Sequence, residues 1–163
     1  MKKFIVISIV LLMLAGFAIT SSAEDLVVGR KHIPVGELTV EVIGDNLVVT
    51  YIITDLEWEL LGTHLYVGIT PPTKSAPGRF PYGPEHVYIL SPGVYVIPLA
   101  DFGEVAILYI AAHAEIGMID GGGYPVLDEY EEQIKETTWA FGDECIPPCK
   151  NWAMYFAFDE LPE

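Results

Sequence analysis

Apolar and polar side chains alternate along much of the chain, and a period of two is typical of half-buried β-strands. In residues 36–43 the apolar side chains recur at every second position. A Gly-Asp-Asn turn follows at 44–46, and residues 47–54 are rich in β-branched residues and tyrosine. The two segments therefore predict a β-hairpin, which is the clearest element of the chain.

Five further segments predict short strands, because they are rich in Val, Ile or aromatic residues and are bounded by turn residues. They are residues 62–70, 87–89, 94–98, 105–116 and 151–158. The segments at 87–89 and 94–98 predict a second hairpin across Ser-Pro-Gly. The run at 105–116 is long for a strand, yet its content of Val, Ile and Tyr favours a buried central strand over a helix.

Three segments depart from the strand pattern. Residues 55–60 carry three acids and a tryptophan, and we expect them to bend over the surface. Residues 71–84 hold five prolines, which lack a backbone donor, so a long loop is expected there. Residues 128–138 are the one expected helix, since Tyr130 and Ile134 fall at helical spacing among acids.

The succession of strands predicts an all-β fold. Seven or eight short strands with Gly and Pro between them, and at most one short helix, are typical of an antiparallel β-sandwich. We expect one domain, because about 140 residues follow the N-terminal segment described next and no internal repeat occurs.

The N-terminus has the three zones of an export signal. A basic start precedes an apolar run at 4–19, and small polar residues follow up to Ala23. We expect residues 1–23 to be a signal peptide cleaved before Glu24, leaving the domain at 24–163. An uncleaved membrane anchor is disfavoured, since a spanning helix needs about 20 apolar residues. The sequence thus predicts a protein of the extracellular space or cell envelope, with no membrane contact after cleavage.

The chain is acidic, with a formal net charge of −15. Loss of the two lysines of the signal brings this to about −17. Such a charge repels nucleic acid and anionic lipid, so no nucleic-acid partner is expected, and it favours divalent cations or basic partners. Solubility alone also accounts for the charge and is the favoured interpretation.

The two cysteines, Cys145 and Cys149, are separated by Ile-Pro-Pro. In an exported chain such a pair predicts a disulfide. The bridge would close a short loop, so its contribution lies at the low end of the usual ~2–4 kcal/mol. Zinc would need two further ligands near the pair, and the spacing supplies none.

Several short motifs occur in a fixed order. They are GELTV at 36–40, THLYVG at 63–68, PGRFPY at 77–82, LYIAAHA at 108–114, ETTW at 136–139 and NWAMYF at 151–156. The succession resembles an uncharacterised β-rich domain that recurs in secreted and cell-surface proteins of archaea and bacteria. The resemblance implies compartment and fold but no catalytic residues. The chain departs from that pattern in being a lone domain and in its acidic insert at 128–132.

His64 and His113 are the main candidates for chemistry, each on a predicted strand. If the two strands are neighbours, both imidazoles would point into one site and bind a metal ion or a proton, with Glu115 nearby. The favoured alternative is structural, with each ring satisfied by a backbone carbonyl or a tyrosine hydroxyl.

The acidic tract at 120–144 is a second candidate metal site. Asp120, Asp128 and Glu129 are candidate calcium ligands, and the three glycines that follow Asp120 would let the loop wrap around an ion. The tract lacks the Asp-x-Asp-x-Asp-Gly spacing of a dedicated calcium loop. Solvated charge is therefore favoured, so no cofactor is expected, and calcium is the alternative for this tract.

Aromatic side chains near loops are candidate contacts for a partner. The candidates are Phe80, Tyr82, Trp58 and Trp139, of which the first two lie in the proline-rich loop and are preferred. Flat rings on a rigid sandwich stack on sugars or hold peptide prolines. The alternative is packing in the core or at its edge, which we expect for Trp152.

The usual enzyme signatures are missing, including Gly-x-Ser-x-Gly and His-Glu-x-x-His. The favoured function is a secreted, non-catalytic module that binds an extracellular protein, a polysaccharide or another copy of itself. One alternative is a small metal-dependent protein or hydrolase that uses His64 and His113. Another is a subunit that assembles into a surface layer or filament through strand edges.

Overall fold

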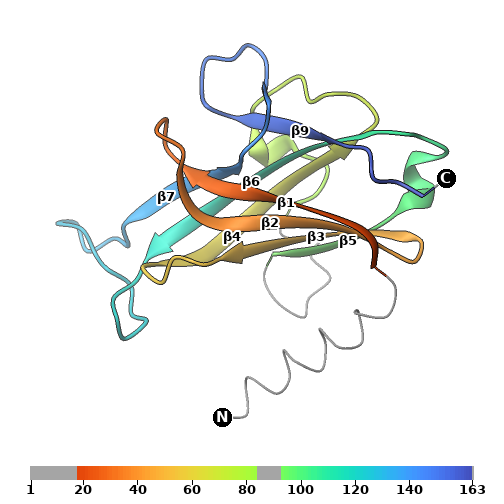
Figure 1. Cartoon of the computed structure of the whole chain (residues 1–163). Coiled ribbons are helices and arrows are strands. Elements are labelled where there is room, and N and C mark those ends of the chain that lie inside the picture. The colour runs from red at the N-terminus through yellow and green to blue at the C-terminus, as the bar shows by residue number, and fades with distance from the viewer. Residues whose placement is uncertain (1–17, 84–92, 163) are drawn as a thin grey trace, which may run out of the picture.

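The computed structural model describes residues 18–83 and 93–162 and shows an all-β protein (Figure 1). Its strands are β1 (Ala18–Val28), β2 (Ile33–Ile43), β3 (Asn46–Ile53), β4 (Trp58–Gly68), β5 (Val94–Pro98), β6 (Leu108–Met118), β7 (Lys135–Ala140), β8 (Glu144–Cys145) and β9 (Met154–Phe158). Within these ranges the helical elements are two short 3-10 turns, η1 (Pro77–Arg79) and η3 (Leu99–Phe102). The predicted fold class is confirmed.

The strands form one antiparallel sheet in the order β5-β3-β2-β1-β7-β6-β9-β8, and β4 also pairs with β6. The predicted hairpin is present as β2 and β3, in which Val40 pairs with Val49. Gly44 and Asp45 make the turn between them. Gly44 has a φ of 59°, a left-handed conformation that glycine adopts without a steric penalty.

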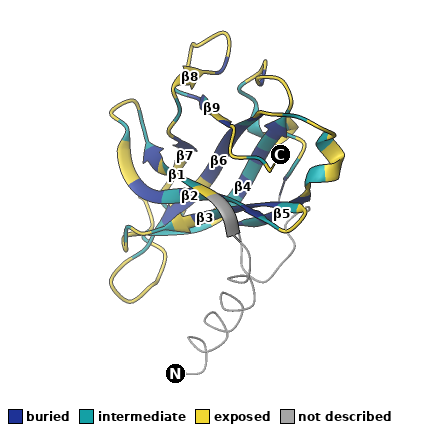
Figure 2. Ribbon diagram, turned by 45° about the vertical axis from the view of Figure 1, so that its right-hand side comes forward, coloured by how far each residue is buried: buried dark blue, intermediate teal, exposed yellow. Residues whose placement is uncertain are grey.

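The sheet folds over so that two layers enclose one core in a sandwich-like arrangement. Val40 and Leu47 come from the β2 and β3 layer, Leu65 and Ile110 come from the β4 and β6 layer, and all four are fully buried in one cluster. Figure 2 shows buried positions along the strands and exposed positions mainly in the loops between them. The alternation in the sequence therefore corresponds to an inner and an outer face.

Buried hydroxyl groups join the two layers. The Thr63 and Tyr95 hydroxyl oxygens lie 2.8 Å apart, and the Tyr95 hydroxyl also donates to the Thr63 carbonyl oxygen at 3.2 Å. The Tyr51 hydroxyl donates to the His64 carbonyl oxygen at 3.1 Å. These bonds connect β3 and β5 to β4, so they fix the spacing between strands that share no ladder.

The predicted helix at 128–138 is wrong. β7 begins at Lys135, and the residues before it form turns. In these turns the Asp128 carboxylate accepts hydrogen bonds from the backbone N–H groups of Tyr130 and Glu132. A side chain that takes up local backbone donors in this way competes with helix formation. The helical spacing of Tyr130 and Ile134 was therefore misleading.

Other boundaries also shift. β4 begins at Trp58, so only the first half of the expected surface bend at 55–60 is a turn. The segment at 87–89 lies outside the described residues. β1 begins at Ala18 and pairs with β2 from there onward, so cleavage before Glu24 would leave residues 24–28 of this strand. That cleavage stays a prediction.

We expect Tyr95→Phe to lower the free energy of unfolding by about 1–3 kcal/mol, because it leaves the buried Thr63 hydroxyl without its partner. Urea unfolding at neutral pH measures this loss. The double variant Thr63→Val/Tyr95→Phe removes both groups and should be no less stable than Tyr95→Phe alone. A Tyr95→Phe midpoint equal to that of the natural protein would contradict the proposed role of this hydroxyl pair.

Candidate functional site

The outer face of β4, β6 and β7 carries a second apolar cluster, on the side away from the main core. Its buried members are Ala111, Trp139, Ile146 and Ala153, and the partly buried residues packed against it are Tyr66, Phe80, Trp152 and Tyr155. Phe80 comes from the proline-rich loop and Ile146 from the loop between β8 and β9. Both loops therefore cover part of this outer face, and Trp152 packs there as the sequence predicts.

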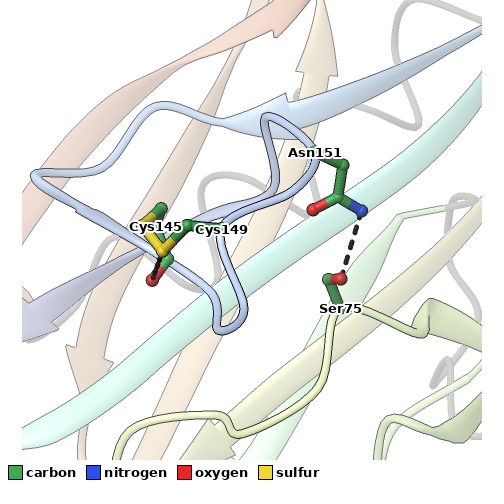
Figure 3. Close-up of a disulfide and its surroundings, with 4 residues drawn as sticks. All are labelled: Ser75, Cys145, Cys149 and Asn151. Atoms are coloured by element: carbon green, nitrogen blue, oxygen red, sulfur yellow. Dashed lines mark hydrogen bonds between the residues drawn. A yellow bond between two sulfur atoms is a disulfide. The ribbon is translucent and has the colours of Figure 1, made fainter.

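A disulfide organises one of these loops. Cys145 and Cys149 are bonded, with Cα atoms 5.4 Å apart, a usual spacing for a disulfide. The predicted bond is thus present, and the loop that it closes inserts the fully buried Ile146 into the outer cluster. The Asn151 side-chain amide donates to the Ser75 hydroxyl at 3.1 Å, which connects this loop to the proline-rich loop (Figure 3).

The two candidate histidines lie side by side on the outer face. His64 in β4 pairs directly with His113 in β6, and their ring centroids are 5.8 Å apart. His113 also pairs with Trp139 in β7, whose ring meets it edge-on at 5.0 Å. His113 is only 6 % exposed, whereas His64 is half-buried. The strands are neighbours, so the condition that the sequence set for a shared site is met.

The electrostatic environment keeps His113 neutral. Burial, and then the nearby His64, lower the pKa of His113 from 6.5 to about 4, because an imidazolium ion there would lose its water. The Nδ1 atoms of both rings are buried and have no hydrogen-bond partner. The carbonyl or tyrosine partner expected for a structural histidine is therefore missing at these two atoms.

Glu115 lies two residues along β6 from His113 and so on the same outer face, where it is exposed. Its cross-strand neighbour is Gly62, where an added Cβ would meet nothing within 4 Å. Across the described ranges, no three His, Cys, Asp or Glu side chains gather closely enough to hold a metal ion. The arrangement thus offers two paired imidazoles beside open space.

The aromatic candidates pack inward rather than standing free. Trp139 is 5 % exposed, so it is not available to a ligand at the surface. The ring of Phe80 packs on Trp139 with centroids 6.1 Å apart, and that of Tyr82 packs on Tyr95 at 6.5 Å. Trp58 is partly buried against the main core. These rings therefore help to hold the loops and layers together.

The acidic candidates build turns. The Asp120 carboxylate accepts the backbone N–H groups of Gly122 and Tyr124 at 2.8 and 3.0 Å, and these bonds lower the pKa of Asp120. The Asp128 carboxylate accepts hydrogen bonds from the backbone N–H groups of Tyr130 and Glu132, while Glu129 is exposed. The carboxylates expected to bind calcium thus order the chain that carries them.

The sequence interpretation missed an exposed apolar surface at one end of the sandwich. Residues 119–134, here called the arm, project beyond β6 and β7 at the left of Figure 1. Tyr124, Leu127 and Tyr130 in the arm are 70 %, 52 % and 76 % exposed, and Leu56 in the neighbouring β3–β4 turn is 88 % exposed. The sequence feature that could have indicated this surface is the presence of tyrosines in a stretch rich in glycine and acidic residues.

A groove of about 870 Å³ is lined by residues around η3, which lies at the opposite end of the sandwich from the arm (Figure 1). Its walls come from η3, the residues that lead into β6, and the segment after β9, with Phe102, Val105 and Leu161 among the apolar lining residues. Neither candidate histidine lines it, so the groove and the histidine pair are separate features.

The chain matches no protein-family model, no curated protein and no solved structure. Its fold and outer face therefore define its class: a sandwich-like all-β protein with a disulfide-bonded loop and a cross-strand histidine pair. In the part of the chain that the structure describes, no helix has the length and hydropathy needed to cross a bilayer.

We expect the stability of the fold to decrease as the pH falls from about 6.5 to about 4. In the unfolded chain His113 takes up a proton near pH 6.5, whereas in the folded protein it does so only near pH 4. The unfolded state therefore binds more protons in this window. Across this window this one group lowers the free energy of unfolding by roughly 3 kcal/mol, because its protonation is disfavoured only in the folded protein. Urea unfolding at several pH values measures the slope.

His113→Gln should reduce that slope, because the titrating group is gone. His32→Gln is the matched control, since it removes a histidine from the β1–β2 turn and leaves the pair intact. Equal slopes in the two variants would show that His113 does not govern this pH dependence.

Proposed function

We propose that the protein is a secreted, non-catalytic binding module whose arm contacts an extracellular polysaccharide. The observation that carries this proposal is the exposure of Tyr124 and Tyr130, at 70 % and 76 %, on an ordered part of the chain. Several large apolar side chains exposed on one ordered segment are a recognised mark of an interaction site. The predicted export signal and the disulfide are compatible with an extracellular role.

The arm is held by backbone hydrogen bonds as well as by its two aspartate turns. The Met118 N–H donates to the Ile134 carbonyl, the Ile134 N–H to the Val126 carbonyl, and the Val126 N–H to the Met118 carbonyl, at 2.8–2.9 Å. The Ile119 N–H donates to the Glu57 carbonyl at 2.8 Å and joins the arm to the β3–β4 turn. A binding surface ordered in advance loses less entropy when a partner arrives.

The chemistry of the arm favours a polyhydroxylated partner. Tyrosine rings stack on the apolar faces of sugars, and carboxylates accept hydrogen bonds from sugar hydroxyl groups. The arm carries five acids and no lysine or arginine, namely Asp120, Asp128, Glu129, Glu131 and Glu132. Neutral polysaccharides satisfy both features without the repulsion that an anionic polymer would meet.

Co-sedimentation with insoluble neutral polysaccharides, such as cellulose and chitin, tests the proposal. We expect the Tyr124→Ala/Tyr130→Ala variant to bind at least about tenfold more weakly than the natural protein, because both stacking rings are lost. Its melting temperature should be unchanged, since both rings are exposed.

Ile69→Ala is the matched control, because Ile69 is 56 % exposed just after the last residue of β4, at the end away from the arm. It should bind like the natural protein. Equal binding by the two variants, or no retention of the natural protein by any neutral polysaccharide, would overturn the proposal.

A further inference from the structure

The histidine pair contains two buried nitrogen atoms that lack partners. These are the Nδ1 atoms of His64 and His113, which belong to directly paired residues. An unsatisfied buried polar atom is unfavourable by about 1–3 kcal/mol, so a ligand that engages the pair would be stabilised. We propose that His64 and His113 bind one divalent transition-metal ion, such as Cu²⁺, Zn²⁺ or Ni²⁺, through one ring nitrogen each.

The spacing of the rings fits one shared ion. A metal–nitrogen bond of about 2.0–2.1 Å puts each imidazole centre roughly 3 Å from the ion, so two ligating rings lie roughly 5–6 Å apart. The observed separation of 5.8 Å falls in this range. The backbone of paired antiparallel strands holds both residues in place, and the edge-on contact with Trp139 fixes the environment of His113. The two rings therefore have the separation that one shared ion requires.

The donor chemistry selects the class of ion. Neutral imidazole favours Cu, Zn and Ni, whereas calcium and magnesium require oxygen ligands. Water would fill the remaining positions from the open space beside Gly62, and Glu115 is the one acid on this face of β6. This site is separate from the arm and does not depend on the proposed polysaccharide binding.

The test uses the protein itself and each metal ion alone. The chain has four histidines, so His32→Gln/His86→Gln removes the other two and keeps the pair. Calorimetric titration with Cu²⁺, Zn²⁺ and Ni²⁺ should give one ion per chain for this variant, with no binding of Ca²⁺. Electron paramagnetic resonance of the Cu²⁺ form should show coupling to two imidazole nitrogens.

His64→Gln is the informative loss variant, because His64 is half-buried and its replacement disturbs the core less than replacement of His113. It should bind at least about tenfold more weakly, with a circular dichroism spectrum like that of the natural protein. Unchanged affinity in His64→Gln would overturn the proposal. Loss of all binding in His32→Gln/His86→Gln would overturn it as well, because the pair alone would then be insufficient.

Discussion

β6 is buried on both of its faces, and this double burial governs how the neighbouring strands and loops are arranged. Its inner residues, such as Ile110 and Ala112, close the main core, and its outer residues Ala111 and His113 are buried as well. A strand that is buried on both faces needs other parts of the chain packed against each face. The opposite layer of the sheet covers the inner face. Side chains from the neighbouring strands and from two loops cover part of the outer face. The small side chain of Ala111 leaves room there for larger rings.

The same constraint produces the unusual chemistry of the outer face. Because β4 and β7 flank β6, the pairing places His64, His113 and Trp139 in one row across three strands. An indole and a second imidazole replace the water that a protonated His113 would need, which is why its pKa is depressed. The disulfide loop and the proline-rich loop stabilise this region by filling the outer cluster beside the row. The packing of the outer cluster and the lowered pKa of His113 thus both follow from the position of β6 between β4 and β7.

Part of the acidic character of the chain has a structural role. Asp120 and Asp128 use their carboxylates to order the arm, so part of the negative charge is structural. The arm in turn holds Tyr124 and Tyr130 in solvent at a fixed end of the sandwich. The histidine pair lies instead on the outer face of β4 and β6. The proposed metal site and the proposed polysaccharide site therefore use different elements and share no residue.

Local patterns in the amino-acid sequence are enough to predict strands and the faces that they bury. Alternation in residues 36–43 and 62–68 identifies which side chains point inward, because the period of a strand is a local property. The sequence also indicated the disulfide, since Cys145 and Cys149 are close along the chain. The apparent helix at 128–138 shows the limit of such patterns, because the hydrogen bonds of Asp128 outweighed the spacing of two apolar residues. Three features could not be predicted in this way, because they depend on which distant strands become neighbours. They are the contact between His64 and His113, the burial of Trp139 and the exposure of the tyrosines of the arm.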